Sequence, residues 1–86
     1  MINNPHDSNR IATTRLDVRG RGCPIPIVHI MNSIEKLKPG ETIEVMATDH
    51  AFPKDVEAWC KRTGHILLEC KHNGEHYVAF IKKKPS

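Results

Sequence analysis

Hydrophobic and polar residues follow two different periods along this chain, and together they predict four strands and two helices. The chain begins with polar residues that have no period, so we expect residues 1–14 to be a flexible N-terminal segment. Leu16 and Val18 then alternate with polar neighbours, which predicts a short strand at Arg15–Arg19. The glycines that follow break this strand and allow a tight turn.

A first helix is predicted to begin beside Cys23. Pro24 suits the first turn of a helix, because the N–H that proline lacks would have no helical partner there. Apolar residues then recur at helical spacing and should face one core: Ile27, Ile30, Met31, Ile34 and Leu37. The run Lys38-Pro39-Gly40-Glu41 predicts the end of this helix, since proline cannot continue it and glycine favours a turn.

The middle of the chain repeats this strand and helix order. Thr42–Ala47 is rich in residues that favour strands. Asp49 is predicted to cap a second helix, which carries Pro53 in its first turn. The apolar stripe of this helix consists of Phe52, Val56, Trp59, Cys60 and Thr63. Gly64 fits the left-handed position that commonly ends a helix.

The last third of the chain predicts a β-hairpin and a tail. His65–His72 alternates as a third strand, and three of its residues are expected on the core face: Ile66, Leu68 and Cys70. Asn73-Gly74 is a strong hairpin signal. Tyr77–Ile81 then completes a fourth strand, and we expect residues 83–86 to form a solvated basic tail.

The element order is therefore β-α-β-α-β-β within one domain of residues 15–82. Right-handed crossovers place both helices on one face of a mixed four-stranded sheet, whose first two strands are parallel and last two antiparallel. We therefore predict a two-layer α/β (α+β) sandwich. In such a sheet the carboxyl ends of the first two strands share one edge, where ligands commonly bind. Cys23 and Asp49 follow these two strand ends.

Length and charge narrow the function classes. A chain of 86 residues is too short to enclose a deep active site, so its chemistry should lie on an edge. The formal net charge is only +3, and the run Lys82-Lys83-Lys84 supplies much of it, so we do not expect direct nucleic-acid binding. No apolar run is long enough for a membrane span or a signal peptide, which predicts a cytoplasmic protein.

Three cysteines and six histidines are the candidate nucleophiles and metal ligands. An odd number of widely spaced cysteines fits a reducing compartment better than a disulfide framework. There is no C-x-x-C pair, and His72 and His76 lack a third ligand in the sequence, so we predict no metal site and no bound cofactor. Cys60 and Cys70 fall on predicted apolar faces and are expected to be inert core thiols.

Cys23 has a different context. It lies in the segment Arg19-Gly20-Arg21-Gly22-Cys23-Pro24-Ile25-Pro26. The thiolate is the reactive form of cysteine, and positive potential favours it. We therefore expect the helix N-terminus to lower the pKa of this thiol, with a further contribution from Arg19 and Arg21. The prolines would hold the sulfur at a defined tip. The alternative from these residues alone is a helix start with a tolerated cysteine. No Ser/His/Asp-like triad can be drawn around Cys23, which argues against a hydrolytic cysteine enzyme.

Three segments together resemble the TusA/SirA family of small sulfur-carrier proteins. They are L-D-V-R-G-R-G-C-P-I-P-I-V, L-K-P-G-E and A-T-D-H-A-F-P-K-D-V-E-A-W-C-K-R-T-G-H, and the match runs from about Leu16 to Ile81. The resemblance implies a βαβαββ sandwich similar to the C-terminal domain of translation initiation factor three. Asp49 matches a family position near the site, where helix capping is its expected role. His50 stands where many relatives have proline, which puts a titratable group beside the site.

The resemblance also implies a function. The cysteine of the family's C-P-x-P motif, here Cys23, accepts sulfane sulfur as a persulfide or thiosulfonate and relays it between proteins. The implied donors are cysteine desulfurases or rhodanese-like proteins. The implied acceptors include relay proteins of the DsrE type, which lead to tRNA thiolation, molybdenum cofactor or sulfur oxidation. Such a sulfurtransferase works by thiol–persulfide exchange, as a carrier rather than a stand-alone catalyst.

The resemblance implies no cofactor, because the persulfide on Cys23 is covalent cargo, and we expect a monomer because a carrier must keep its edge free. Two other functions stay open from the sequence. One is a nucleic-acid-binding or regulatory module, suggested by the initiation-factor-like fold and the lysine tail. The other is a thiol redox sensor at Cys23.

Overall fold

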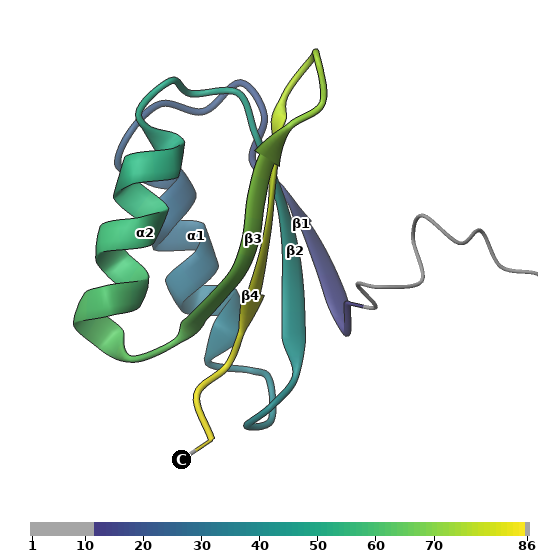
Figure 1. Cartoon of the computed structure of the whole chain (residues 1–86), viewed down its shortest axis with the longest axis vertical. Coiled ribbons are helices and arrows are strands. Elements are labelled where there is room, and N and C mark those ends of the chain that lie inside the picture. Colours follow the sequence, from purple (N-terminus) through teal and green to yellow (C-terminus); the bar gives the residue numbers. More distant parts are fainter. Residues whose placement is uncertain (1–11, 86) are drawn as a thin grey trace, which may run out of the picture.

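The computed structural model describes residues 12–85, which follow the predicted order of elements (Figure 1). The elements are β1 (Thr14–Asp17), α1 (Ile25–Ile34), β2 (Thr42–Ala47), α2 (Phe52–Thr63), β3 (Ile66–His72) and β4 (Tyr77–Lys82). The strands form one sheet in the order β1-β2-β4-β3. β1 is parallel to β2, whereas β4 is antiparallel to both β2 and β3. The predicted mixed sheet is confirmed.

Two layers enclose the core, since both helices cover the same face of the sheet (Figure 1). Each layer contributes fully buried apolar side chains, for example Ile30 of α1, Val56 of α2, and Val45 and Ile81 of the sheet. Burying one such side chain stabilises the fold by about 1.5–3 kcal/mol. The predicted two-layer sandwich is therefore confirmed, and its core lies between the helices and the sheet.

The loops after β1 and β2 meet at one edge of the sheet. β1 ends at Asp17, two residues before the end of the predicted strand. The N–H of Val18, the next residue, still donates to Met46 O in β2 at 2.8 Å. The N–H of Gly20 donates to Thr48 Oγ1 at 2.8 Å and links the two loops. Gly20 has a φ of 81°, a conformation that favours glycine. This edge is where the sequence predicted a site.

The buried stripe of α1 is narrower than predicted. Pro26, Ile30 and Ile34 are buried, and Pro24 is the residue that precedes the helix. Met31 was predicted to face the core, but it is exposed. The reason is geometric, because Met31 lies about 100° around the helix from Ile30, which is at the centre of the stripe. Leu37 follows the end of α1 and packs against the core from the turn.

The start of α2 differs from the prediction, whereas its end agrees with it. Ala51 is the N-cap residue, and no side chain caps this helix. Asp49 lies two residues earlier, and its Oδ2 accepts the Ala51 N–H at 3.2 Å. The carboxylate therefore forms the turn that leads into α2 instead of capping it. Gly64 ends the helix with a φ of 90°, and its N–H donates to Cys60 O at 2.8 Å.

The alternation predicted for β3 is wrong because the strand contains an irregularity. The pairing register with β4 shifts between Leu67 and Glu69, as in a β-bulge. One extra residue reverses which side chains face the helices. Leu67 and Cys70 therefore pack against the core, while Ile66 and Leu68 are exposed.

The two ends of the domain also differ from the prediction. Thr14 was assigned to the N-terminal segment but begins β1, and the rest of that segment lies largely outside the described residues. Lys83 and Lys84 were expected to be a solvated tail. Instead, Lys83 Nζ donates to Glu35 O, at the C-cap of α1, at 3.3 Å and to Leu37 O at 2.6 Å, and Lys84 Nζ donates to Thr63 O at 3.1 Å. Cations there stabilise the carboxyl ends of the helices. Within residues 12–85, no helix has the length and apolar character that crossing a bilayer requires.

Candidate functional site

Cys23 is exposed at the sheet edge that the sequence predicted, immediately before the N-cap residue of α1. The N–H of Ile25 donates to Gly22 O at 2.9 Å and closes the turn that carries the sulfur. The Cys23–Pro24 peptide bond is cis. Pro26 is buried in the first turn of the helix and anchors this end of α1 in the core. The thiol therefore extends from a short loop that is held on both sides.

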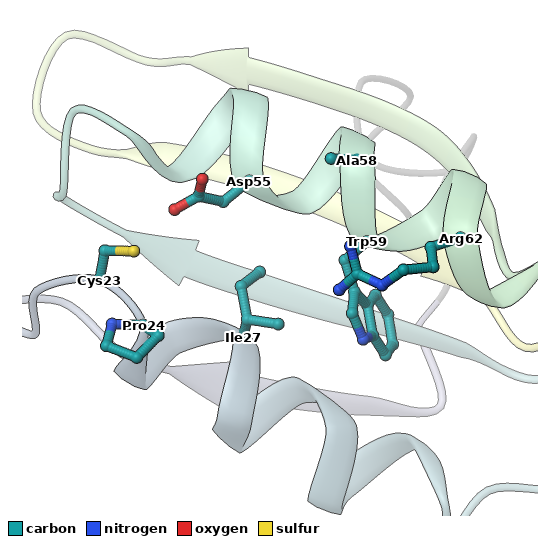
Figure 2. Close-up of a pocket in the computed structure, with 7 residues that line it drawn as sticks. All are labelled: Cys23, Pro24, Ile27, Asp55, Ala58, Trp59 and Arg62. Atoms are coloured by element: carbon teal, nitrogen blue, oxygen red, sulfur yellow. The ribbon is translucent and has the colours of Figure 1, made fainter.

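A pocket of about 230 Å³ separates α1 from α2, and Cys23 lies at one end of it (Figure 2). The lining residues are Cys23, Pro24, Ile27, Asp55, Ala58, Trp59 and Arg62. The α2 residues that line it recur at helical spacing, so they form one stripe of the helix. Asp55 is at the Cys23 end, and Arg62 lies further along α2 near Trp59.

Asp55 is the group that most affects Cys23. The two residues line the same end of the pocket (Figure 2), and hydrogen bonding of the thiol to the Asp55 carboxylate is the main cause that raises the pKa of Cys23. Desolvation and the negative charges of Asp55 and Asp49 raise the pKa further. A negative neighbour disfavours a thiolate, so this environment favours the neutral thiol in the unloaded protein. The expectation of a lowered pKa is wrong.

The N-terminus of α1 has fewer donors for an anion than a helix start without prolines. Helix N-termini favour anions because their first N–H groups lack helical partners. Here Pro24 and Pro26 have no N–H, and the N–H of Ile25 is already bonded to Gly22 O. The prolines position the sulfur, but they also remove donors that a thiolate would use.

The two arginines do not form the expected positive environment. Arg19 donates from Nε and Nη2 to the two carboxylate oxygens of Asp17, at 2.9 and 2.8 Å. This bidentate bond holds the pKa of Asp17 well below its ordinary value. Arg21 is exposed, and neither Arg19 nor Arg21 lines the pocket. The charges that act on Cys23 are the carboxylates of Asp49 and Asp55.

The structure thus gathers only part of the predicted site. Cys23 and Pro24 share the pocket wall, and Asp49 is near enough to affect the thiol. The predicted residues outside the pocket lining are Arg19, Arg21, Gly22, Pro26, Asp49 and His50. His50 is exposed in the loop before α2. Asp55 and Arg62 were not predicted as site residues, although their spacing with Trp59 on one helix stripe was a usable signal.

The other two thiols have different surroundings. Cys60 is buried, with only 4% of its surface exposed, and burial raises its pKa to about 11. Cys70 is half-buried against the core, and its pKa is raised by burial and then by the charge of Glu57. Cys23 is therefore the exposed thiol among the described residues. Within the same residues, no group of three His, Cys, Asp or Glu side chains is arranged to hold a metal ion.

This geometry suits exchange chemistry between sulfur atoms. An exposed sulfur on a constrained loop can be approached by another sulfur, and the exchange needs a thiolate and an accessible partner. A hydrolytic mechanism needs a base within hydrogen-bond reach of the nucleophile. Asp55 lies beside Cys23 but raises the pKa of the thiol, so on its own it does not give the activated nucleophile that hydrolysis requires.

Comparison with known proteins agrees with the resemblance in the sequence. The model of the sulfurtransferase TusA family matches residues 14–83. The putative sulfur carrier protein YrkF of Bacillus subtilis is 43% identical over 72 residues, which cover 84% of this chain and 39% of YrkF. The chain thus spans about two fifths of the length of that relative.

Two further proteins are similar over almost their whole length. The sulfur carrier protein TusA of Allochromatium vinosum is 37% identical over 68 residues, or 79% of this chain and 90% of that protein. The crystal structure of a SirA-like protein from Desulfitobacterium hafniense has a TM-score of 0.74 at 16% identity, covering 84% of this chain and 99% of that one. This likeness supports the fold. From the family match and the identity to its relatives, the chain belongs to the sulfurtransferase TusA family.

Proposed function

We propose that this protein carries sulfane sulfur as a persulfide on Cys23 and passes it between partner proteins. The observation that carries the proposal is the position of Cys23, which is exposed at the sheet edge while Cys60 is buried and Cys70 half-buried. Membership of the TusA family supports the proposal, as do the relatives that are named sulfur carrier proteins. The function is that of a carrier, because an open sulfur suits transfer between proteins.

The transfer step conserves atoms and electrons. The Cys23 thiol loses its proton, and the thiolate attacks the outer sulfur of a persulfide on the donor. A bond forms between Cys23 Sγ and that sulfur, while the bond within the donor persulfide breaks. The donor's inner sulfur leaves as a thiolate and takes up a proton. The same exchange with an acceptor thiol then delivers the sulfur.

The surface around Cys23 suits protein partners. Ile25 and Val28, on α1 immediately after the cysteine, are apolar but 40% and 39% exposed. Exposed apolar side chains beside a reactive group favour contact with another protein. The donor would be a cysteine desulfurase or a rhodanese-like protein, and the acceptor a DsrE-type or other relay protein.

Loading with sulfur tests the proposal directly. We expect incubation with a cysteine desulfurase and cysteine to add the mass of one sulfur atom to the intact protein. Cys23→Ser should not gain this mass, whereas Cys70→Ser, which removes a half-buried thiol, should gain it. Equal loading of Cys23→Ser would contradict the proposal. Reversible sulfenic acid at Cys23 without sulfur loading would instead favour a redox sensor.

A further inference from the structure

The Asp55 carboxylate and the Cys23 thiol face each other across the pocket between the helices (Figure 2). Asp55 is in the first turn of α2, where the helix dipole favours a negative charge. Cys23 precedes α1, so the two residues reach the same pocket from different elements. Neither partner could make this contact without the packing of α1 against α2.

The charged groups around this contact are predominantly negative. Asp49, in the loop before α2, is a second carboxylate that acts on Cys23. Arg62 lines the same pocket but lies further along α2, and Arg19 is bonded to Asp17. Within residues 12–85, neither Asp49 nor Asp55 forms a salt bridge. A protein with a net charge of +3 thus has a negative site around its exposed thiol.

We propose that Asp55 holds the unloaded Cys23 thiol in its neutral form, and that a partner activates this thiol by presenting a lysine or arginine to Asp55. The inference rests on the proposed function, because it concerns how a carrier remains inactive between its partners. It assigns the partner a chemistry, namely a cationic side chain beside its sulfur-bearing cysteine. Charge complementarity with Asp49 and Asp55 is the argument for that partner.

Activation follows from the exchange of one hydrogen bond for an ion pair. The incoming cation pairs with Asp55, so the thiol loses its acceptor and its negative neighbour is neutralised. The thiol proton passes to water, and the Cys23 thiolate attacks the outer sulfur of the partner's persulfide. The bond within that persulfide breaks, and the partner's thiolate leaves and takes a proton from water. Away from a partner, Cys23 is protected from unwanted disulfide exchange.

The first experiment measures the alkylation of Cys23 by iodoacetamide, an uncharged probe, at pH 7.5. Asp55→Asn should react about threefold faster for each tenfold gain in thiolate, because a thiol of lower pKa is also less nucleophilic. Asp55→Glu keeps the charge and should return the rate toward that of the wild type. In Asp55→Asn the increase of the alkylation rate with pH should begin at a lower pH than in the wild type. A purely structural role would not shift this pH profile.

The matched control is Glu57→Gln. Glu57 lies two residues further along the same helix, is exposed, and pairs with Lys61 at 3.9 Å. The substitution makes the same change in net charge without touching Cys23. We expect the alkylation rate of Glu57→Gln to equal that of the wild type.

The second experiment tests the preference for a cation with two small disulfides. Cystamine carries two ammonium groups, whereas 2-hydroxyethyl disulfide is neutral. The rate of exchange of Cys23 with cystamine, divided by its rate with 2-hydroxyethyl disulfide, should fall about threefold in Asp55→Asn. This is the effect expected from the loss of one screened charge. Each probe's own reactivity cancels when the ratio is compared between variants. Glu57→Gln should keep the wild-type ratio.

The outcomes separate this inference from the proposed function. If Asp55→Asn leaves both the alkylation rate and the ratio unchanged, Asp55 does not control the thiol. If Glu57→Gln changes them equally, overall charge is responsible and the assignment of Asp55 is overturned. If both tests succeed but the wild type never gains sulfur from a desulfurase, the role of Asp55 stands and the carrier function fails.

Discussion

Two thiols of this protein, Cys23 and Cys60, both have a raised pKa, but for different physical reasons. At Cys23 the first cause is a hydrogen bond to a carboxylate, and the sulfur is exposed. At Cys60 the cause is burial within the core. A neighbouring charge can be neutralised by a docking partner, whereas burial is relieved only by opening the fold. The same direction of shift therefore marks a controllable thiol in one region and an inert thiol in the other.

The largest expected difference between the two thiols is in their protection from alkylation. We expect Cys60 to react with iodoacetamide at least about a thousandfold more slowly in the native protein than in urea at the same pH. Its high pKa suppresses the thiolate about 300-fold, and burial excludes the reagent as well. The alkylation of Cys23 should be less than about tenfold slower in the native protein than in urea. Peptide mass spectrometry after timed labelling measures both rates, and comparable protection of the two thiols would remove the distinction.

A smaller effect is expected in the stability of the protein at alkaline pH. The pKa of Cys60 is about 11 in the folded protein, against about 8.5 in an unfolded chain. Because the folded state favours the neutral thiol, this stabilisation is complete below about pH 8.5. It is lost as the pH rises toward 11, because the unfolded state then ionises first. The free energy of unfolding should fall by about 3 kcal/mol, because each unit of difference in pKa between the two states is worth 1.36 kcal/mol.

Urea unfolding of the wild type and of Cys60→Ala between pH 8 and 11 measures this loss. Every other ionisable group is common to the two proteins. The difference between the two pH profiles therefore isolates Cys60. Parallel profiles would show that Cys60 does not couple ionisation to unfolding.

The sequence predicted most of the fold because each element has a clear period. Ile30 and Ile34 mark the buried face of α1, and Gly64 marks the end of α2. The faces of β3 could not be predicted, since the irregularity after Leu67 depends on pairing with β4 and not on any local period. The contacts of Lys83 with the end of α1 were missed for a similar reason, because they join segments far apart in the chain.

The site was predicted less completely than the fold. Cys23 was identified from its neighbours in the sequence, and its exposure is confirmed. Its electrostatics were predicted wrongly because Arg19 was assigned to the thiol, although Asp17 lies two residues away and binds it. Asp55 is distant in the sequence from Cys23, so the contact depends on how α1 and α2 pack. The cargo came from the family resemblance, because residue spacing carries no information about sulfane sulfur.

The smallest predicted effect applies the same substitution to each thiol. Cys60→Ser should destabilise the protein by about 1–2 kcal/mol, because it buries a hydroxyl in an apolar core. Cys23→Ser should change the stability by less than about 0.5 kcal/mol, because that side chain is exposed. Cys70→Ser should fall between them, since Cys70 is half-buried. Urea denaturation at pH 7 measures all three. If Cys23→Ser is as costly as Cys60→Ser, Cys23 is a structural residue, and the loss of sulfur loading in that variant would reflect unfolding rather than a missing nucleophile.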